Sequence, residues 1–153
     1  MTVHPAAELF PLMEGEDFQA LVEDIRARGL KHPIVTLDGR VLDGRNRERA
    51  CAEAGVEPRY VEADLNGDSP VEFVLGENLH RRNLTPSQRA AIAAKAMDLF
   101  AAEAKARMLA GKAPDPELKR AHGPGRARAI ASKQFGVADA QVARAIALRK
   151  HAP

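Results

Sequence analysis

The stretch PIVTLDGRVLDGRNRERACAEAG, residues 33–55, predicts the fold of the N-terminal half. Its first five residues are mostly apolar and β-branched, which is typical of a short buried strand. The Asp-Gly pair that follows favours a tight hairpin turn into a second strand, Arg40–Leu42. After a break at Gly44, Arg45–Ala54 has the pattern of a helix that the next glycine ends. A hairpin that leads directly into an arginine-rich helix predicts mixed α and β structure.

Further elements flank this hairpin and helix. Apolar residues recur at helical spacing in residues 17–28, where Asp17 can cap a helix and Gly29 can end it. The segment EPRYVE, residues 57–62, favours another strand, and a short helix is expected over residues 71–79. Strands and helices therefore alternate along the first half of the chain.

The second half of the chain is predicted to be helical. Thr85-Pro86-Ser87-Gln88 is typical of a capped helix start, and an alanine-rich helix should continue to about Leu109. Residues 111–125 are rich in glycine and proline and favour a loop. Two short helices, about 126–135 and 139–149, follow with a glycine between them. Their lengths and spacing are those of a helix-turn-helix.

Charge divides the chain into unlike halves. Residues 1–76 contain 8 Lys and Arg against 15 Asp and Glu, a net charge of −7. Residues 77–153 contain 15 against 6, a net charge of +9. A basic half can bind a polyanion such as nucleic acid, and it can also be an ordinary solvated surface. Charge alone does not choose between these two interpretations.

Composition excludes several classes of protein. Aromatic residues make up only 4% of the chain, which disfavours base stacking on single-stranded nucleic acid. The single cysteine, Cys51, excludes an intramolecular disulfide and a cysteine-based zinc site. We see no signal peptide and no apolar run of membrane-spanning length, so we expect a cytoplasmic protein without a membrane partner.

A first candidate site lies at residues 44–50. A strand brings the chain to Gly44, and an arginine-rich helix starts there, so free backbone N–H groups and the helix dipole favour an anion. Arg45 and Arg49 share one helical face, whereas Arg47 points elsewhere. Arginine can bind phosphate through two parallel hydrogen bonds. The alternative is a solvated helix whose arginines pair with Glu48.

A second candidate site lies at residues 77–88. Glu77 and Asn78 offer hard oxygen ligands that suit Mg²⁺ beside a phosphate. Arg81 lies four residues after Glu77, so both side chains can face one pocket. The alternative is a helix end with a weak Glu77–Arg81 surface pair.

Three motifs in order carry a family resemblance. GRNRERA at Gly44–Ala50 is similar to the family box GERRxRA, and ENLHR at Glu77–Arg81 is similar to the box ENLQR. GLKHPIVTL at Gly29–Leu37 is similar to the upstream pattern of a helix, a glycine and PI[VL]V. The chain thus resembles the ParB/sulfiredoxin superfamily, in its ParB-like branch. The resemblance implies an α+β fold, with a ParB/sulfiredoxin-like domain over residues 1–82 and an all-helical helix-turn-helix region over residues 83–153.

The resemblance also implies a pocket for CTP, or another nucleotide, with Mg²⁺ held by Glu77 and Asn78. Arg45 stands where the family has glutamate and Asn46 where it has arginine, which leaves the preference for CTP and its hydrolysis open. Cys51 falls outside the box, so we expect no sulfiredoxin-like redox role. The residues expected to bind the nucleotide are Gly44, Arg45, Asn46, Arg47, Arg49, Ala50, Glu77, Asn78, Arg81, His32 and Pro33.

The helix-turn-helix at about residues 126–150 is expected to bind DNA. Gln141 and Arg144 would be exposed on its second helix, and their side chains suit adenine and guanine edges. Asp139 can cap that helix. The alternative is an ordinary helical hairpin. Phosphate contacts are expected from Arg126, Arg128, Lys133, Arg149 and Lys150.

These observations together predict a ParB-like DNA-binding protein that a nucleotide regulates, in partition or transcription control. A homodimer through the helical region would match two-fold DNA sites. The alternatives are a metal-dependent nuclease, in which Asp43 could join Glu77, a nucleotide-dependent phosphotransferase, or an interaction module without nucleotide. Weak CTP hydrolysis is left open, and no catalytic residue is assigned.

Overall fold

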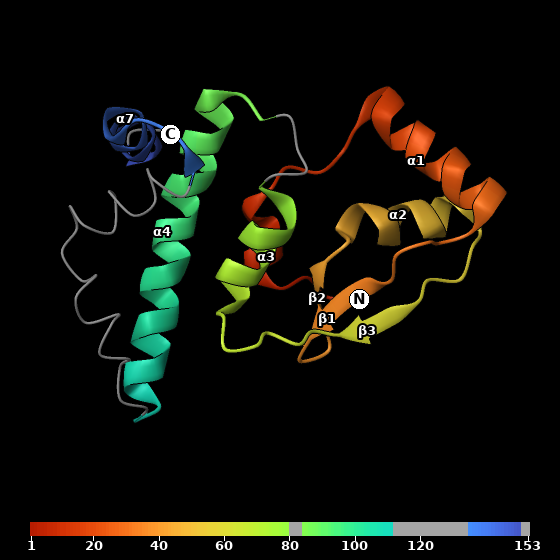
Figure 1. The fold of residues 1–153 in the computed structure, drawn as a ribbon, viewed down its shortest axis with the longest axis horizontal. Coiled ribbons are helices and arrows are strands. Elements are labelled where there is room, and N and C mark those ends of the chain that lie inside the picture. Colours follow the sequence, from red (N-terminus) through yellow and green to blue (C-terminus); the bar gives the residue numbers. More distant parts are fainter. Residues whose placement is uncertain (80–83, 112–134, 151–153) are drawn as a thin grey trace. The chain divides into compact units, whose positions relative to one another are not determined.

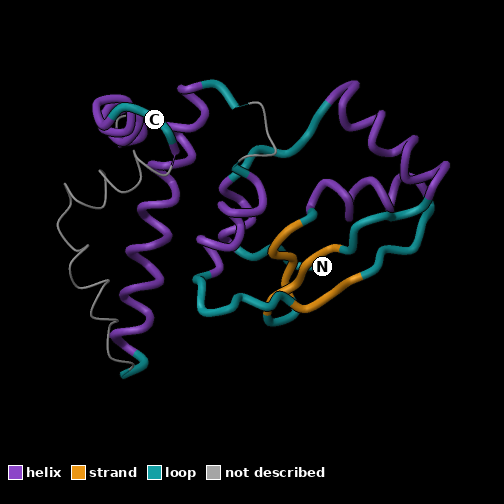
Figure 2. Tube along the Cα trace, in the orientation of Figure 1, coloured by secondary structure: helices purple, strands orange, loops and turns teal. Residues whose placement is uncertain are grey.

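The computed structural model describes residues 1–79, 84–111 and 135–150, and the chain divides into two compact units, Met1–Asn78 and Leu79–Pro153. The first unit combines helices with a small sheet, and the described elements of the second are helices (Figure 2). The expected α+β fold class is therefore confirmed. The domain boundary expected between residues 82 and 83 lies outside the described residues.

A three-stranded sheet forms the centre of the first unit. Its strands are β1 (Ile34–Leu37), β2 (Arg40–Asp43) and β3 (Tyr60–Glu62), in the order β2-β1-β3. β2 runs antiparallel to β1, and β3 runs parallel to it (Figure 1). Asp38 and Gly39 join the first two strands with φ values of 50° and 71°, as a tight hairpin turn with the twist of a sheet requires. The predicted hairpin is confirmed.

Two helices pack against each other beside this sheet. α1 (Gly15–Arg28) contacts α2 (Arg45–Ala54), and α2 contacts β1 (Figure 1). The predicted bounds of α2 are confirmed, and a glycine in the left-handed region ends it. The buried residues of this core cluster come from both helices, from the sheet and from the loop before it: Phe18, Val22, Ile25, Leu30, Ile34, Val41, Ala50 and Cys51.

Two further helices contact β2. They are the 3-10 helix η1 (Pro5–Leu9) and α3 (Pro70–Asn78), which also contact each other. Leu9, Leu42 and Leu75 are fully buried, one from each of these three elements. The C-terminal end of α3, with Glu77 and Asn78 of the second motif, therefore belongs to the same unit as the end of β2, where the first motif begins.

Three element boundaries differ from the sequence-based expectations. α1 begins at Gly15 after the extended residue Glu14, so Asp17 lies in its first turn and does not cap it. β3 covers only three of the six expected residues. Arg59, just before it, donates through its side chain to the carbonyls of Leu30 and Lys31. α3 starts and ends one residue earlier than expected.

The second unit contains α4 (Pro86–Leu109) and α7 (Asp139–Lys150), which pack against each other. The predicted capping box is confirmed, because Thr85 N–H donates to Gln88 Oε1 at 2.9 Å and Gln88 N–H to Thr85 Oγ1 at 3.2 Å. α7 begins at Asp139, so the expected cap is its first helical residue. Val142 is fully buried.

The expected loop at 112–125 and most of the helix at about 126–135 lie outside the described residues. A helix-turn-helix thus stays a prediction. Within the described ranges, no helix is long and apolar enough to cross a membrane.

Candidate functional site

The turn between β2 and α2 depends on Gly44. Its φ of 101° is in the left-handed region that favours glycine, and it is the N-cap residue of α2. A Cβ atom added at Gly44 would lie 2.8 Å from Nη2 of Arg47, so the missing side chain lets this guanidinium fold back over the turn. The N–H groups in the first turn of α2 have no partner within the helix, which makes them donors for an anion.

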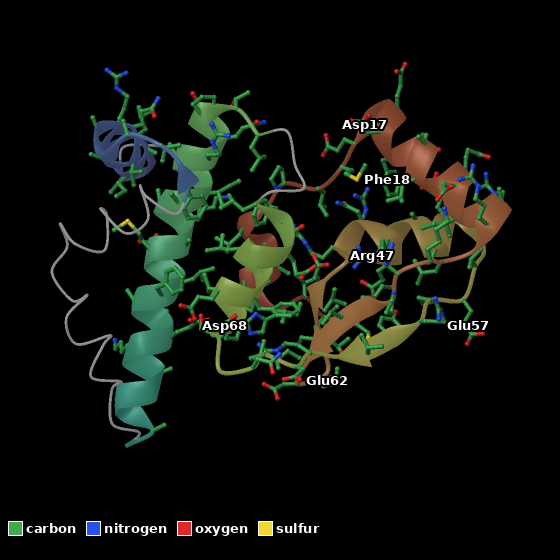
Figure 3. The ribbon with its side chains drawn as sticks, viewed as in Figure 1. Asp17, Phe18, Arg47, Glu57, Glu62 and Asp68 are labelled. Atoms are coloured by element: carbon green, nitrogen blue, oxygen red, sulfur yellow. The ribbon has the colours of Figure 1, made fainter. Side chains whose placement is uncertain are left out.

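Asp43 joins the two sequence motifs at this turn. Arg47 Nη2 donates to Asp43 Oδ2 at 3.0 Å, and Asn78 Nδ2 donates to Asp43 Oδ1 at 2.9 Å. Arg47 Nη2 also lies 3.2 Å from the carbonyl oxygen of Pro33, which it contacts as a donor. The fold therefore brings together one residue from each of the three motifs. Figure 3 shows Arg47 on α2, above the sheet.

The guanidinium of Arg47 has more donors than this arrangement satisfies. Its Nε is buried and has no hydrogen-bond partner among the described residues. The side chain is 22% exposed and that of Asp43 is 13% exposed, so the pair is shielded from water without being enclosed. A buried donor without a partner costs free energy, so this guanidinium is held at some cost in stability.

Three other polar residues of the first motif, Arg45, Asn46 and Arg49, bind the segment before α1. Arg45 Nη2 donates to the Phe10 carbonyl at 2.6 Å, and Arg49 Nη1 donates to the Met13 carbonyl at 3.2 Å. Asn46 is 9% exposed, and its Oδ1 accepts the N–H of Met13 at 3.0 Å. The predicted shared face of Arg45 and Arg49 is therefore turned toward main-chain oxygens.

The charged side chains of Arg45 and Arg49 are partly shielded from water. Burial lowers the pKa of Arg45 from its usual value, partly offset by the carboxylate of Glu8. Arg49 also stacks over the ring of Phe18, with its guanidinium carbon 4.3 Å from the ring centroid. Arg47 is thus the arginine of this motif that contacts Asp43.

The remaining predicted nucleotide residues have varied surroundings. Ala50 is fully buried in the core, whereas His32 is exposed. Glu77 is half-buried in the last turn of α3. Arg81 lies outside the described residues. Asp43, which the prediction assigned only to a nuclease alternative, is the central contact, and its place between a strand end and a helix-capping glycine is the sequence signal that marks it.

The chemistry of the cluster suits a hard divalent cation only in part. Asp43, Glu77 and Asn78 offer the oxygen atoms that Mg²⁺ prefers. Asn78 donates through Nδ2 to Asp43 and also to the carbonyl of Val74, at 3.1 Å. Over the described ranges, no group of three His, Cys, Asp or Glu side chains could hold a metal ion. A cation here would need ligands from a phosphate as well.

Cys51 is a core residue. Its side chain is fully buried, and burial raises the pKa of its thiol. A thiol of this kind is unreactive, because the thiolate is the nucleophilic form. Cys51 lies on α2, after the residues of the first motif.

A second candidate surface lies in the helical unit. A groove of about 480 Å³ runs between α4 and α7. Ala91, Ala94 and Ala145 line it, as do Lys95 of α4 and Arg144 of α7. Gln141 also lines the groove, and its Oε1 accepts the N–H of Ala138 at 3.1 Å. The structure therefore adds Lys95 to the cationic residues beside Arg144, a neighbour that the sequence did not indicate.

The side chains of the other predicted DNA-binding residues lie outside what the structure describes. Arg149 and Lys150 belong to the last turn of α7. Arg126, Arg128 and Lys133 lie outside the described residues.

Comparison with known proteins gives one kind of match. No protein-family model and no curated protein matches the chain. Among solved structures, the chain is similar to the C-terminally truncated chromosome-partitioning protein ParB from Caulobacter crescentus complexed with CTP-gamma-S. That similarity has a TM-score of 0.41 and a sequence identity of 19%, and it covers 92% of this chain and 69% of the ParB chain.

Proposed function

We propose that this chain is a nucleotide-responsive DNA-binding protein. The first unit binds a nucleoside triphosphate with Mg²⁺ at the N-terminus of α2, and CTP is the first candidate. The helical unit binds DNA. The biological role would be partition or transcription control.

One observation carries the nucleotide part of the proposal: Asp43 links Arg47 of the first motif to Asn78 of the second. The two motifs were matched separately in the sequence, and their contact forms a cluster beside free helix N–H groups. A phosphate group can accept hydrogen bonds from the arginine and from the helix N–H groups at the same time.

The oxygen donors beside Arg47 fit Mg²⁺ if phosphate completes the ligand set, because Mg²⁺ is usually bound by one or two carboxylates and by substrate phosphates. When bound, the cation would neutralise part of the phosphate charge. The residues that would hold it are Asp43 and Glu77, with the amide of Asn78 positioned by Val74. Arg47 would then contact the phosphate directly.

Calorimetric titration tests the nucleotide part. The wild-type protein is titrated with CTP, ATP, ADP and GTP in the presence of Mg²⁺, and Arg47→Ala and Arg28→Ala are titrated in parallel. Arg28 is a suitable control because it pairs with Asp24 on the exposed face of α1. We expect binding to be lost in Arg47→Ala and kept in Arg28→Ala. Equal binding by both variants would show that the site is elsewhere.

The DNA part rests on the +9 charge of the second half and on the groove that contains Lys95 and Arg144. It is tested by fluorescence anisotropy with labelled duplexes, with and without the nucleotide that calorimetry identifies. Light scattering in the same samples tests the proposed homodimer. Cleavage of plasmid DNA with Mg²⁺, lost in Glu77→Gln, would instead support the nuclease alternative.

A further inference from the structure

Asp43 accepts from one donor atom of Arg47 and one of Asn78, and a phosphate bound at this turn would compete for both. Its Oδ2 accepts from Arg47 at 3.0 Å, and its Oδ1 accepts from Asn78 at 2.9 Å. Each carboxylate oxygen is thus bound by one motif residue. The side chain is only 13% exposed, so water screens its charge weakly. The carboxylate is a fixed negative charge inside the proposed anion site.

The side-chain amide of Asn78 is oriented with its NH₂ group toward Asp43. Nδ2 donates both to Asp43 and to the carbonyl oxygen of Val74. Both acceptors are oxygens, so only the NH₂ group of the amide can satisfy them. In this arrangement Asn78 is a donor toward the cluster, and Asp43 is the residue that places a negative charge there.

A phosphate without a cation would meet two obstacles here. It would compete with Asp43 for Arg47 and Asn78, and it would be repelled by the carboxylate at short range. A divalent cation removes both obstacles, since it binds a carboxylate and phosphate oxygens together. The carboxylate would then attract the cation–phosphate complex, whereas it repels the free phosphate.

We propose that Asp43 makes phosphate binding at this site dependent on a divalent cation. This inference rests on the proposed function and deepens it. Asp43 acts as a selectivity residue that admits a nucleotide carrying its cation and rejects the bare nucleotide. A simple structural ion pair, by contrast, would affect the stability of α2 and leave the metal dependence of binding unchanged.

The experiment is a binding cycle. CTP affinity is measured by calorimetry with excess Mg²⁺ and with EDTA, for wild type, Asp43→Asn and the control Asp24→Asn. Asp24 is a suitable control because it also pairs with an arginine four residues away on a helix, but on the exposed face of α1. Circular dichroism checks the fold of each variant. Asp43→Ser serves as a second neutral variant if Asp43→Asn does not fold.

We expect Mg²⁺ to raise the CTP affinity of wild type and Asp24→Asn by about 5- to 150-fold, the usual range for coupling between two ligands. In Asp43→Asn this factor should fall markedly, because binding in EDTA improves. Equal metal dependence in Asp43→Asn and wild type would overturn the inference while leaving the proposed function intact. The absence of CTP binding in every sample would overturn both.

Discussion

The guanidinium of Arg45 donates a 2.6 Å hydrogen bond to the main-chain carbonyl of Phe10, which lies 35 positions earlier in the chain. Asn46 and Arg49 bind Met13 in the same segment. The first turns of α2 therefore hold the segment between η1 and α1. These contacts join the N-terminal segment to α2. We therefore expect their main effect to be on the stability of the fold and not on ligand binding.

Arg45→Ala should lower the free energy of unfolding of the protein by about 1.5–3 kcal/mol, the usual range for a hydrogen bond to a charged group. Chemical denaturation followed by circular dichroism measures this. The matched control is Arg28→Ala, because Arg28 pairs with Asp24 on the exposed face of α1 and its loss should cost much less stability. If Arg45→Ala is as stable as wild type and fails only in nucleotide binding, Arg45 belongs to the phosphate site.

Gly44→Ala should weaken nucleotide binding as well as lower the free energy of unfolding. Alanine at a φ of 101° costs about 1–2 kcal/mol, and its Cβ would displace the guanidinium of Arg47. Gly55→Ala is the control, because Gly55 ends the same helix at a φ of 71° with no atom within 4 Å of the added Cβ. Both variants should lose similar stability, measured by denaturation. Only Gly44→Ala should lose CTP affinity, and equal affinities would place the ligand away from this turn.

The hairpin and α2 could be predicted from the sequence because local signals agree there. The Asp38-Gly39 turn and the closing glycine of α2 each favour one backbone conformation, and the structure has them. The partners of the arginines could not be predicted. Residues 10, 13 and 33 reach the arginines of α2 only through tertiary packing. Helical spacing alone could therefore group Arg45 with Arg49 but could not say what that face contacts.

His4 should make stability depend on pH. Its Nδ1 accepts the N–H of Ala6 at 3.2 Å, and burial lowers its pKa below 6.5, helped by Arg40 and opposed by Asp38. Between pH 6.5 and the lower pKa of the folded state, His4 is protonated more fully in the unfolded state than in the folded state. The free energy of unfolding should therefore fall as the pH is lowered through this range. Denaturation at about pH 8 and about pH 5 measures the loss.

His4→Asn is the matched variant for this pH effect. Asparagine can accept the same N–H and cap η1, but it does not titrate. The difference in unfolding free energy between the two pH values should therefore be smaller in His4→Asn than in wild type. An unchanged difference would assign the pH dependence to carboxylates and not to His4.

Lys95 and Arg144 should contribute to DNA binding in different ways. Both line the groove between α4 and α7, but a lysine on α4 is expected to contact phosphate, whereas an arginine on α7 can reach a base edge. Lys95→Ala should weaken binding to all sequences alike and reduce the slope of log affinity against log salt by about 1. Arg144→Ala should remove about 1–3 kcal/mol of preference for the best sequence.

Anisotropy titrations over a range of salt, on the preferred and on a scrambled duplex, separate these effects. Lys105→Ala is the control, because Lys105 is also an exposed lysine of α4 and is absent from the groove lining. Equal salt slopes for Lys95→Ala and Lys105→Ala would mean that the groove does not contact DNA phosphate. If Arg144→Ala weakens both duplexes equally, Arg144 contacts the backbone, and the sequence must be recognised by other residues.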